Sequence, residues 1–235
     1  MLRPIYSRRH VAKLDVHARS RHNIAMRITN LHSRAYAQFT EKIRPGDIGA
    51  VVETGLVGRL SARFILPSTD FFHFFLVADY IPLENDYVIY ESIPSHGVSV
   101  GRLSWYLPFT VAIFRPNTDE VLSRTILKPE ELGRRAVWQA TKFGRCKYDY
   151  RLCAIIMLRT FWGCFRNLSR GKGFYIDFTE IPFSKDKRLL CTEMVDEAYN
   201  ELFPVFDRRY ELLPANFLNS YLEANIDHVC GWTGK

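Results

Sequence analysis

The segment Phe71–Ala78 (FFHFFLVA) constrains the fold of this chain more than any other stretch of the sequence. Successive side chains of a strand point to opposite faces of its sheet, and here both faces carry aromatic or branched groups. Such a strand is buried on both sides and therefore lies in the centre of a sheet. A second strand pattern, Tyr87–Ser92, follows after a short loop at Tyr80–Asn85. Two strands joined by so short a loop form an antiparallel hairpin.

Weaker patterns add further strands and several helices around this hairpin. Pro129–Phe143 has a proline in its first turn and a glycine after its end, which is typical of a helix. Arg151–Phe165 is apolar, and it predicts a helix that is buried or that forms a lid. The remaining expected elements are strands at Ile48–Val52, Ser95–Val100 and Phe109–Arg115, and helices at Gly55–Ile65, Asn117–Leu127 and Pro214–Glu223.

The register of the hairpin brings two polar side chains together. If its loop is centred on Pro82, residue 73 lies directly opposite residue 91. Directly opposed side chains are roughly 5 Å apart on one face, so His73 and Glu91 become neighbours, whereas a slip of one residue would place them on opposite faces. A carboxylate beside an imidazole fixes the tautomer and orientation of the ring. The alternative interpretation is a core histidine bonded to a backbone group.

A further polar cluster stands at the start of a predicted helix, in the segment Leu189–Tyr199. Hydroxyl and acid groups fill its first turns, where a helix favours negative charge, and apolar residues recur at helical spacing on one face. Cys191 lies at the start, where backbone N–H groups point outward, stabilise a thiolate and bind a developing oxyanion. The alternative interpretation is that Cys191 is a small, buried apolar residue.

The thiols and the apolar segments bear on the location of the protein. The five cysteines are irregularly spaced and include no CxxC pair, which argues against a zinc site or a disulfide scaffold. An odd count leaves at least one thiol free, which is typical of a reducing compartment. The first residues contain no apolar leader, and no apolar run is long enough to span a bilayer. We therefore expect a cytoplasmic protein without a transmembrane segment.

The net charge of +7 belongs to the N-terminus. Residues 1–40 contain eight basic residues and one acidic residue, so the 32 basic and 25 acidic residues of the chain leave 24 of each behind them. This division predicts a basic arm at 1–40 and a domain at 41–235. The arm ends in a helix pattern from Ile24 to Phe39, which either packs on the domain with a solvated basic face or binds anionic lipid or nucleic acid. An Arg-rich leader is also compatible with organelle targeting.

Strand His73, strand Glu91 and helix-start Cys191 are the residue types of a thiol nucleophile, its base and an orienting group. The order of the surrounding segments resembles the circularly permuted NlpC/P60 superfamily, whose members include the YiiX/YebB-like cysteine hydrolases and the lecithin:retinol acyltransferase-like enzymes. The resemblance covers residues 44–203 and departs from the family at Phe72, where members often have a small residue. The segments that carry it are Pro45–Ile48, His73, Val88–Ser92, Gly97–Val98, Val111–Arg115, Tyr148–Asp149 and Leu190–Tyr199.

This resemblance implies a papain-like α+β fold, with an antiparallel sheet packed on helices and the histidine before the cysteine in the chain. It also implies that Cys191 is the nucleophile, His73 the base and Glu91 the third, polar member of a triad. Tyr148 matches a family tyrosine near the nucleophile, for which the resemblance implies a supporting role. The segment between Asp149 and Cys191 is long, which is compatible with a lid or a specificity insert.

The implied reaction is acyl transfer without a metal or an organic cofactor. The Cys191 thiolate attacks an amide or ester carbonyl to form a thioester, and His73 passes a proton to the leaving group. Peptide, isopeptide and cell-wall peptide amides and lipid esters all fit this chemistry. We expect an amidase or peptidase, with a lipid acyltransferase or esterase as the alternative. Two non-catalytic alternatives are a binding protein that has kept the fold, and an adaptor that contacts nucleic acid or an anionic membrane through the basic arm.

Overall fold

The computed structural model describes residues 34–52, 71–94, 96–116, 127–144, 146–151, 188–200 and 226–233, and also Ala154, Ile155, Leu158, Trp162 and Phe165. The helices expected at 55–65 and 214–223, nearly all of the helix expected at 117–127, and the start of the arm helix lie outside these residues. No helix in the described part of the chain is long and apolar enough to cross a membrane.

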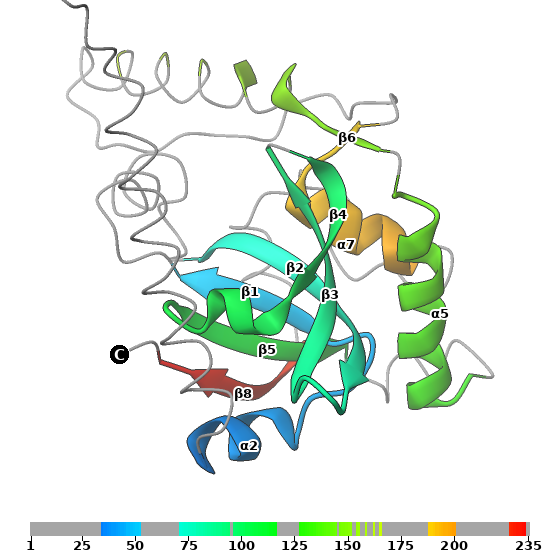
Figure 1. Cartoon of the computed structure of the whole chain (residues 1–235). Helices are drawn as coiled ribbons and strands as arrows, with labels where there is room; N and C mark the ends of the chain where they lie inside the picture. Colours follow the sequence, from blue (N-terminus) through cyan, green and yellow to red (C-terminus); the bar gives the residue numbers. More distant parts are fainter. Residues whose placement is uncertain are drawn as a thin grey trace, which may run out of the picture.

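The architecture is α+β, and an antiparallel sheet lies at its centre. In the described residues this sheet consists of β1 (Ile48–Val52), β2 (Phe71–Ile81), β3 (Asp86–Ile93), β4 (Gly97–Arg102), β5 (Thr110–Pro116) and β8 (Ile226–Trp232). The strand order is β4-β3-β2-β1-β5-β8, and every neighbouring pair is antiparallel (Figure 1). The aromatic strand β2 lies between β1 and β3, so the prediction of a central strand is confirmed.

Both faces of β2 are covered, as its sequence requires. The helices around the sheet are α2 (Arg34–Thr40), the 3-10 helix η1 (Leu103–Tyr106), α5 (Pro129–Thr141) and α7 (Cys191–Asn200). Phe74 and Leu76 share one apolar cluster with residues of α5 and α7. Phe75 and Val77 share a second cluster with residues of α2 and η1. The sheet therefore separates two apolar layers, and the layer that contains α7 includes the predicted nucleophile helix.

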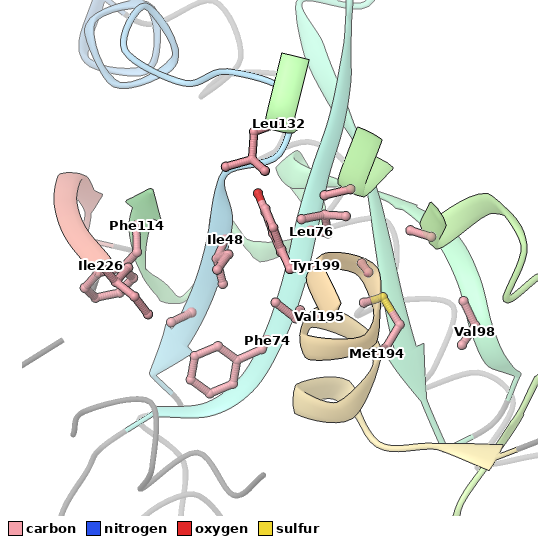
Figure 2. Close-up of a cluster of buried hydrophobic side chains, with 14 residues drawn as sticks. Ile48, Phe74, Leu76, Val98, Phe114, Leu132, Met194, Val195, Tyr199 and Ile226 are labelled. Atoms are coloured by element: carbon pink, nitrogen blue, oxygen red, sulfur yellow. The ribbon is translucent and has the colours of Figure 1, made fainter. Parts of the chain in front are cut away.

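Helix α7 buries one apolar stripe against the sheet. Met194, Val195 and Tyr199 are almost completely buried, and Figure 2 shows Val195 beside Phe74 and Tyr199 beside Ile48. Val195 and Tyr199 are one helical turn apart and Met194 adjoins Val195, so the three side chains lie on the same side of the helix. Burying each large apolar side chain stabilises the fold by about 1.5–3 kcal/mol. The packing of this stripe therefore fixes the position of the first residue of α7 relative to β2.

The turn before β1 anchors both α5 and the end of α7. Gly46 has a φ of 91°, and a Cβ added there would lie 2.2 Å from Gly133 Cα. Two glycines therefore allow the backbone of this turn to touch the backbone of α5. The Tyr199 hydroxyl donates a hydrogen bond to the Gly46 carbonyl. The adjacent Asp47 carboxylate accepts hydrogen bonds from Arg115 at 2.7 and 2.8 Å.

The register of the β2–β3 hairpin differs from the predicted one. Strand β2 continues to Ile81, so the turn is shorter than the loop expected at Tyr80–Asn85. Phe75 lies opposite Glu91, and the predicted direct pairing of His73 with Glu91 is wrong by two residues. Because side chains alternate with a period of two, this shift leaves both residues on the same face. They are diagonal neighbours, still within reach of long side chains.

Helix α2 lies in the segment that was assigned to the basic arm, but its side chains belong to the core. Tyr36 is fully buried and its hydroxyl donates to the buried Asp86 carboxylate at 3.1 Å. The Trp232 ring centroid lies 6.0 Å from that of Tyr36 and 5.9 Å from that of Phe39. Residues 34–40 therefore pack with the domain, and we move the expected boundary of a removable arm from residue 40 to residue 33.

We expect Phe39→Ala to lower the free energy of unfolding by about 3 kcal/mol, because truncating a buried aromatic ring leaves a cavity between α2 and β8. Denaturant unfolding of the full chain, followed by tryptophan fluorescence, measures this change. Gln38→Ala is the matched control, since Gln38 is an exposed residue of the same helix and its loss should change stability by less than about 0.5 kcal/mol. Equal stabilities for the two variants would show that α2 is not part of the folded core.

Candidate active site

The sheet brings His73 and Glu91 into direct contact. His73 Nε2 lies 2.9 Å from Glu91 Oε2, and both side chains are buried. Glu91 is opposite Phe75, and His73 is two residues before Phe75 on β2, so both polar side chains leave the same face. A buried carboxylate at this distance holds the imidazole in one orientation and stabilises its charged form.

Helix α7 brings Cys191 to the same place. Cys191 is the first residue of α7, and its side chain lies close enough to the His73 ring to raise the pKa of the imidazole. Cys191 is partly accessible to solvent, whereas His73 and Glu91 are buried. The structure therefore brings the three side chains together with the sulfur on the accessible side. Their catalytic roles stay predictions.

The chain before α7 is held by two short strands, β6 (Lys147–Tyr148) and β7 (Arg188–Leu189), which pair in parallel. The Ser92 hydroxyl donates to the Leu189 carbonyl at 2.6 Å. Ser92 follows Glu91 on β3, so this bond ties the entry of α7 to the strand that carries the carboxylate. The positions of the sulfur and the carboxylate are therefore linked through one side-chain hydrogen bond as well as through packing.

Glu193 caps the first turn of α7. Its carboxylate accepts a hydrogen bond from the Leu190 N–H at 2.8 Å, as a glutamate at the third helical position does in a capping box. Burial raises the pKa of Glu193 to about 7; the Leu190 N–H opposes this shift, and the neighbouring acids Asp149, Glu197 and Asp196 add to it. The start of α7 therefore contains a carboxyl group that changes charge near neutral pH.

The charge of His73 is set by its two polar neighbours. Burial lowers the pKa of the His73 imidazole, but the hydrogen bonds to Cys191 and Glu91 outweigh burial and raise the pKa from 6.5 to about 9. The ring therefore carries a positive charge at neutral pH. The site therefore contains a charged imidazole between a partly accessible sulfur and a buried carboxylate.

Tyr106, at the end of η1, is a site residue that the sequence did not indicate. Its hydroxyl donates to Glu91 Oε2, and its ring stacks on His73 with centroids 5.5 Å apart and planes inclined by 26°. Burial, followed by the nearby charge of Glu91, raises the pKa of Tyr106 above its usual range, so the phenol keeps the proton that it donates. Tyr106 therefore braces both the carboxylate and the imidazole. No motif marks it, because this contact depends on how the segment between β4 and β5 folds back.

The second carboxylate oxygen of Glu91 fits into the space above Gly101 on β4. A Cβ added at Gly101 would lie 2.4 Å from Glu91 Oε1, which is closer than a carbon and an oxygen can approach without one of them moving. We expect Gly101→Ala to push the carboxylate away from His73. The pKa of His73 should then fall below about 9, by roughly one unit. NMR titration of the His73 ring protons measures this shift.

Gly144→Ala is the matched control for this substitution. A Cβ added at Gly144 meets the Thr141 carbonyl oxygen at 3.6 Å, which is an ordinary contact, so the titration of His73 should not change. If Gly101→Ala leaves the His73 titration unchanged as well, the Glu91 contact does not control the charge of the imidazole.

Tyr148 lies close to the start of α7 through its backbone. It pairs with Leu189 in the parallel β6–β7 ladder, two residues before Cys191. Its ring packs edge-on against Tyr150, with centroids 5.2 Å apart, and the Tyr150 hydroxyl donates to the Pro94 carbonyl. The structure therefore places Tyr148 next to the start of α7, and its supporting role stays a prediction.

Metal-ligating side chains do not converge in the described part of the chain, where no group of three or more His, Cys, Asp and Glu side chains could hold a metal ion.

Among solved structures, the chain is similar to the metalloprotein yiiX from Escherichia coli O157:H7, with 14% sequence identity and a TM-score of 0.37, over 77% of this chain and 82% of that chain. No protein-family model and no curated protein matches the chain. The proposal of a function therefore rests on the geometry of the site.

Proposed function

We propose that the protein is a cysteine-dependent hydrolase of the amidase or peptidase type that acts through Cys191, His73 and Glu91. One observation carries this proposal: a partly exposed thiol at a helix start lies beside an imidazole whose pKa it raises, and that imidazole contacts a buried carboxylate at 2.9 Å. Nucleophile, base and orienting group are arranged in this way in thiol and serine hydrolases. A purely structural ion pair does not need an accessible sulfur beside it, whereas a nucleophile does.

The proposed reaction uses each of the three groups. The Cys191 sulfur attacks the carbonyl carbon of an amide, and backbone N–H groups of the first turn of α7 stabilise the negative oxygen. His73 gives its proton to the leaving nitrogen as the C–N bond breaks, which leaves a thioester and a free amine. His73 then takes a proton from the water that attacks the thioester. The products are the carboxylic acid and the restored thiolate–imidazolium pair, while Glu91 keeps the imidazole oriented.

We also propose membership of the circularly permuted NlpC/P60 superfamily, with a papain-like fold. Two features support it: an antiparallel sheet packed on α7, and a chain order of histidine on β2, carboxylate on β3 and cysteine at the start of α7. In this proposal Tyr148, whose backbone adjoins β7, supports the nucleophile. A free nucleophilic thiol is suited to a reducing compartment such as the cytoplasm.

Thiol labelling tests the proposal without knowledge of the substrate. We expect limiting iodoacetamide at pH 6 to 7 to modify Cys191 at least about tenfold faster than the other thiols of the folded chain, because only a thiolate reacts. Cys230 is an internal comparison, since burial, with a contribution from the Asp47 charge, raises its pKa to about 11. His73→Ala should slow the labelling of Cys191 and leave that of Cys230 unchanged. Mass spectrometry of proteolytic fragments reads out both sites.

Slow labelling of Cys191 would contradict the proposal. If Cys191 labels no faster than Cys230, and His73→Ala does not change its rate, then Cys191 is a small packing residue and the nucleophile assignment is withdrawn. The α+β architecture stands in either case.

A further inference from the structure

The described residues between Arg151 and Phe165 are helical, and they expose large apolar side chains. Leu158 and Trp162 are each 70% exposed and Phe165 is 67% exposed. The Trp162 and Phe165 rings lie side by side, with centroids 6.5 Å apart. The sequence predicted a buried helix or a lid for this segment. For these side chains the prediction of burial is wrong, because an apolar sequence does not say whether its partner belongs to the same chain.

The exposed residues form one continuous face. Ala154, Leu158 and Trp162 follow at intervals of four residues, and Phe165 comes three residues later, so all four project from the same side of a helix. We call these four residues the Trp162 face. Single exposed apolar residues are common on proteins, but a contiguous stripe that includes a tryptophan and a phenylalanine usually marks an interaction site.

The charged residues in the sequence segment that carries the Trp162 face have a single sign. Between Asp149 and Asp177 the sequence contains five basic residues and no acidic residue. Arg159 and Arg166 directly follow Leu158 and Phe165 in the chain. A helix with Leu, Trp and Phe on one face, in a segment whose charged residues are all basic, is typical of an interfacial helix.

We propose that the Trp162 face binds the surface of a bilayer that contains anionic phospholipids, with the helix lying in the plane of the interface. Its apolar side chains enter the boundary between head groups and acyl chains, where tryptophan is favoured, and the basic residues remain among the anionic head groups. The segment has 15 residues from Arg151 to Phe165, fewer than the ~20 that cross a bilayer. This inference does not depend on the proposed function.

Charge selects the bilayer over a second copy of the chain as the occupant. Joining two Trp162 faces would bring two segments of five basic and no acidic residues against each other, and like charges at an interface oppose association. An anionic bilayer supplies the opposite charge together with an apolar interior, so it satisfies both properties of this surface.

Vesicle co-sedimentation of the full chain tests the inference. We expect the protein to sediment with vesicles of phosphatidylcholine and phosphatidylglycerol, and to bind pure phosphatidylcholine vesicles and high-salt samples of the mixed vesicles at least about tenfold more weakly. The double variant Trp162→Ser/Phe165→Ser should bind the mixed vesicles at least about tenfold more weakly than the original chain. All of the substituted side chains are exposed, so near-UV circular dichroism should confirm an intact fold.

Trp138→Ser is the matched control, because Trp138 is 61% exposed on a different helix, α5. It should bind the mixed vesicles as the original chain does, and so should Cys191→Ala, which separates this inference from the proposed catalysis. Unchanged binding by the double variant, an equal loss in Trp138→Ser, or binding that is abolished only by deletion of residues 1–33 would overturn the proposal. Light scattering that shows a dimer lost in the double variant, without vesicle binding by the original chain, would assign the face to a second copy instead.

Discussion

Replacing Cys191 with alanine is expected to reduce hydrolysis at least about a thousandfold, because the reaction then loses the atom that forms the acyl-enzyme. His73 lies beside Cys191 and contacts Glu91 at 2.9 Å, so the alanine variant keeps the proposed base and orienting group without the proposed nucleophile. The measurement uses two sets of chromogenic substrates, peptide amides and acyl esters, at neutral pH. Faster turnover of amides supports an amidase or peptidase, and faster turnover of esters supports the alternative lipid esterase.

Cys230→Ala is the control for this experiment. Cys230 is a free, partly buried thiol on β8 whose sulfur contacts the Phe39 carbonyl at 3.6 Å. Its loss should leave the rate within about twofold of the original chain, because β5 and β1 separate β8 from the strand that carries His73. If Cys191→Ala and Cys230→Ala hydrolyse the best substrate equally well, the reaction does not pass through the Cys191 thiol.

Hydrolysis should also fall as the pH rises through about 9, where His73 loses its proton. The neighbouring sulfur and carboxylate raise the pKa of His73, so the charged imidazole persists to high pH and is lost above about 9. Above that pH the thiolate still attacks, but the leaving nitrogen no longer receives a proton. Hydrolysis should therefore decline while alkylation by iodoacetamide does not. Rates of both reactions across the alkaline range give the two profiles.

Glu91→Gln should move this alkaline limit to lower pH, by roughly one unit, because the amide no longer stabilises the imidazolium. Tyr106→Phe is the milder comparison, since it removes a hydrogen bond to Glu91 and keeps the ring that stacks on His73. Its limit should lie between those of Glu91→Gln and the original chain. A limit that stays near 9 in Glu91→Gln would show that the carboxylate does not hold the proton on His73.

The elements that were predicted well are those whose own residues demand burial. β2 has apolar groups on both faces and lies inside the sheet, and α7 carries one apolar stripe and begins at Cys191. The strand β8 was not predicted, because Asp227 and His228 are exposed and its side chains alternate weakly. It is a strand because its backbone pairs with β5, and a backbone pairing leaves little trace in side-chain pattern.

The register of the β2–β3 hairpin was predicted only in part. Tyr80 and Tyr87 pair across the two strands with rings 5.1 Å apart, which extends the ladder into the predicted loop. The register also shifts within the ladder, at an irregularity between Val77 and Asp79. The sequence indicated the shared face of His73 and Glu91 correctly, because a shift of two residues preserves side-chain alternation. It could not indicate which residues are directly opposed, because that depends on the turn and on the irregularity.

Residue types, their order in the chain and the face from which each one projects could all be read from the amino-acid sequence, since they are properties of short segments. The fold added the contacts between distant segments. It placed Tyr106 on His73, fitted Glu91 above Gly101, and made Tyr36 and Phe39 part of the core instead of the arm. Such contacts depend on how the whole sheet and its helices pack, because a shift of a few ångströms in any one element would break them.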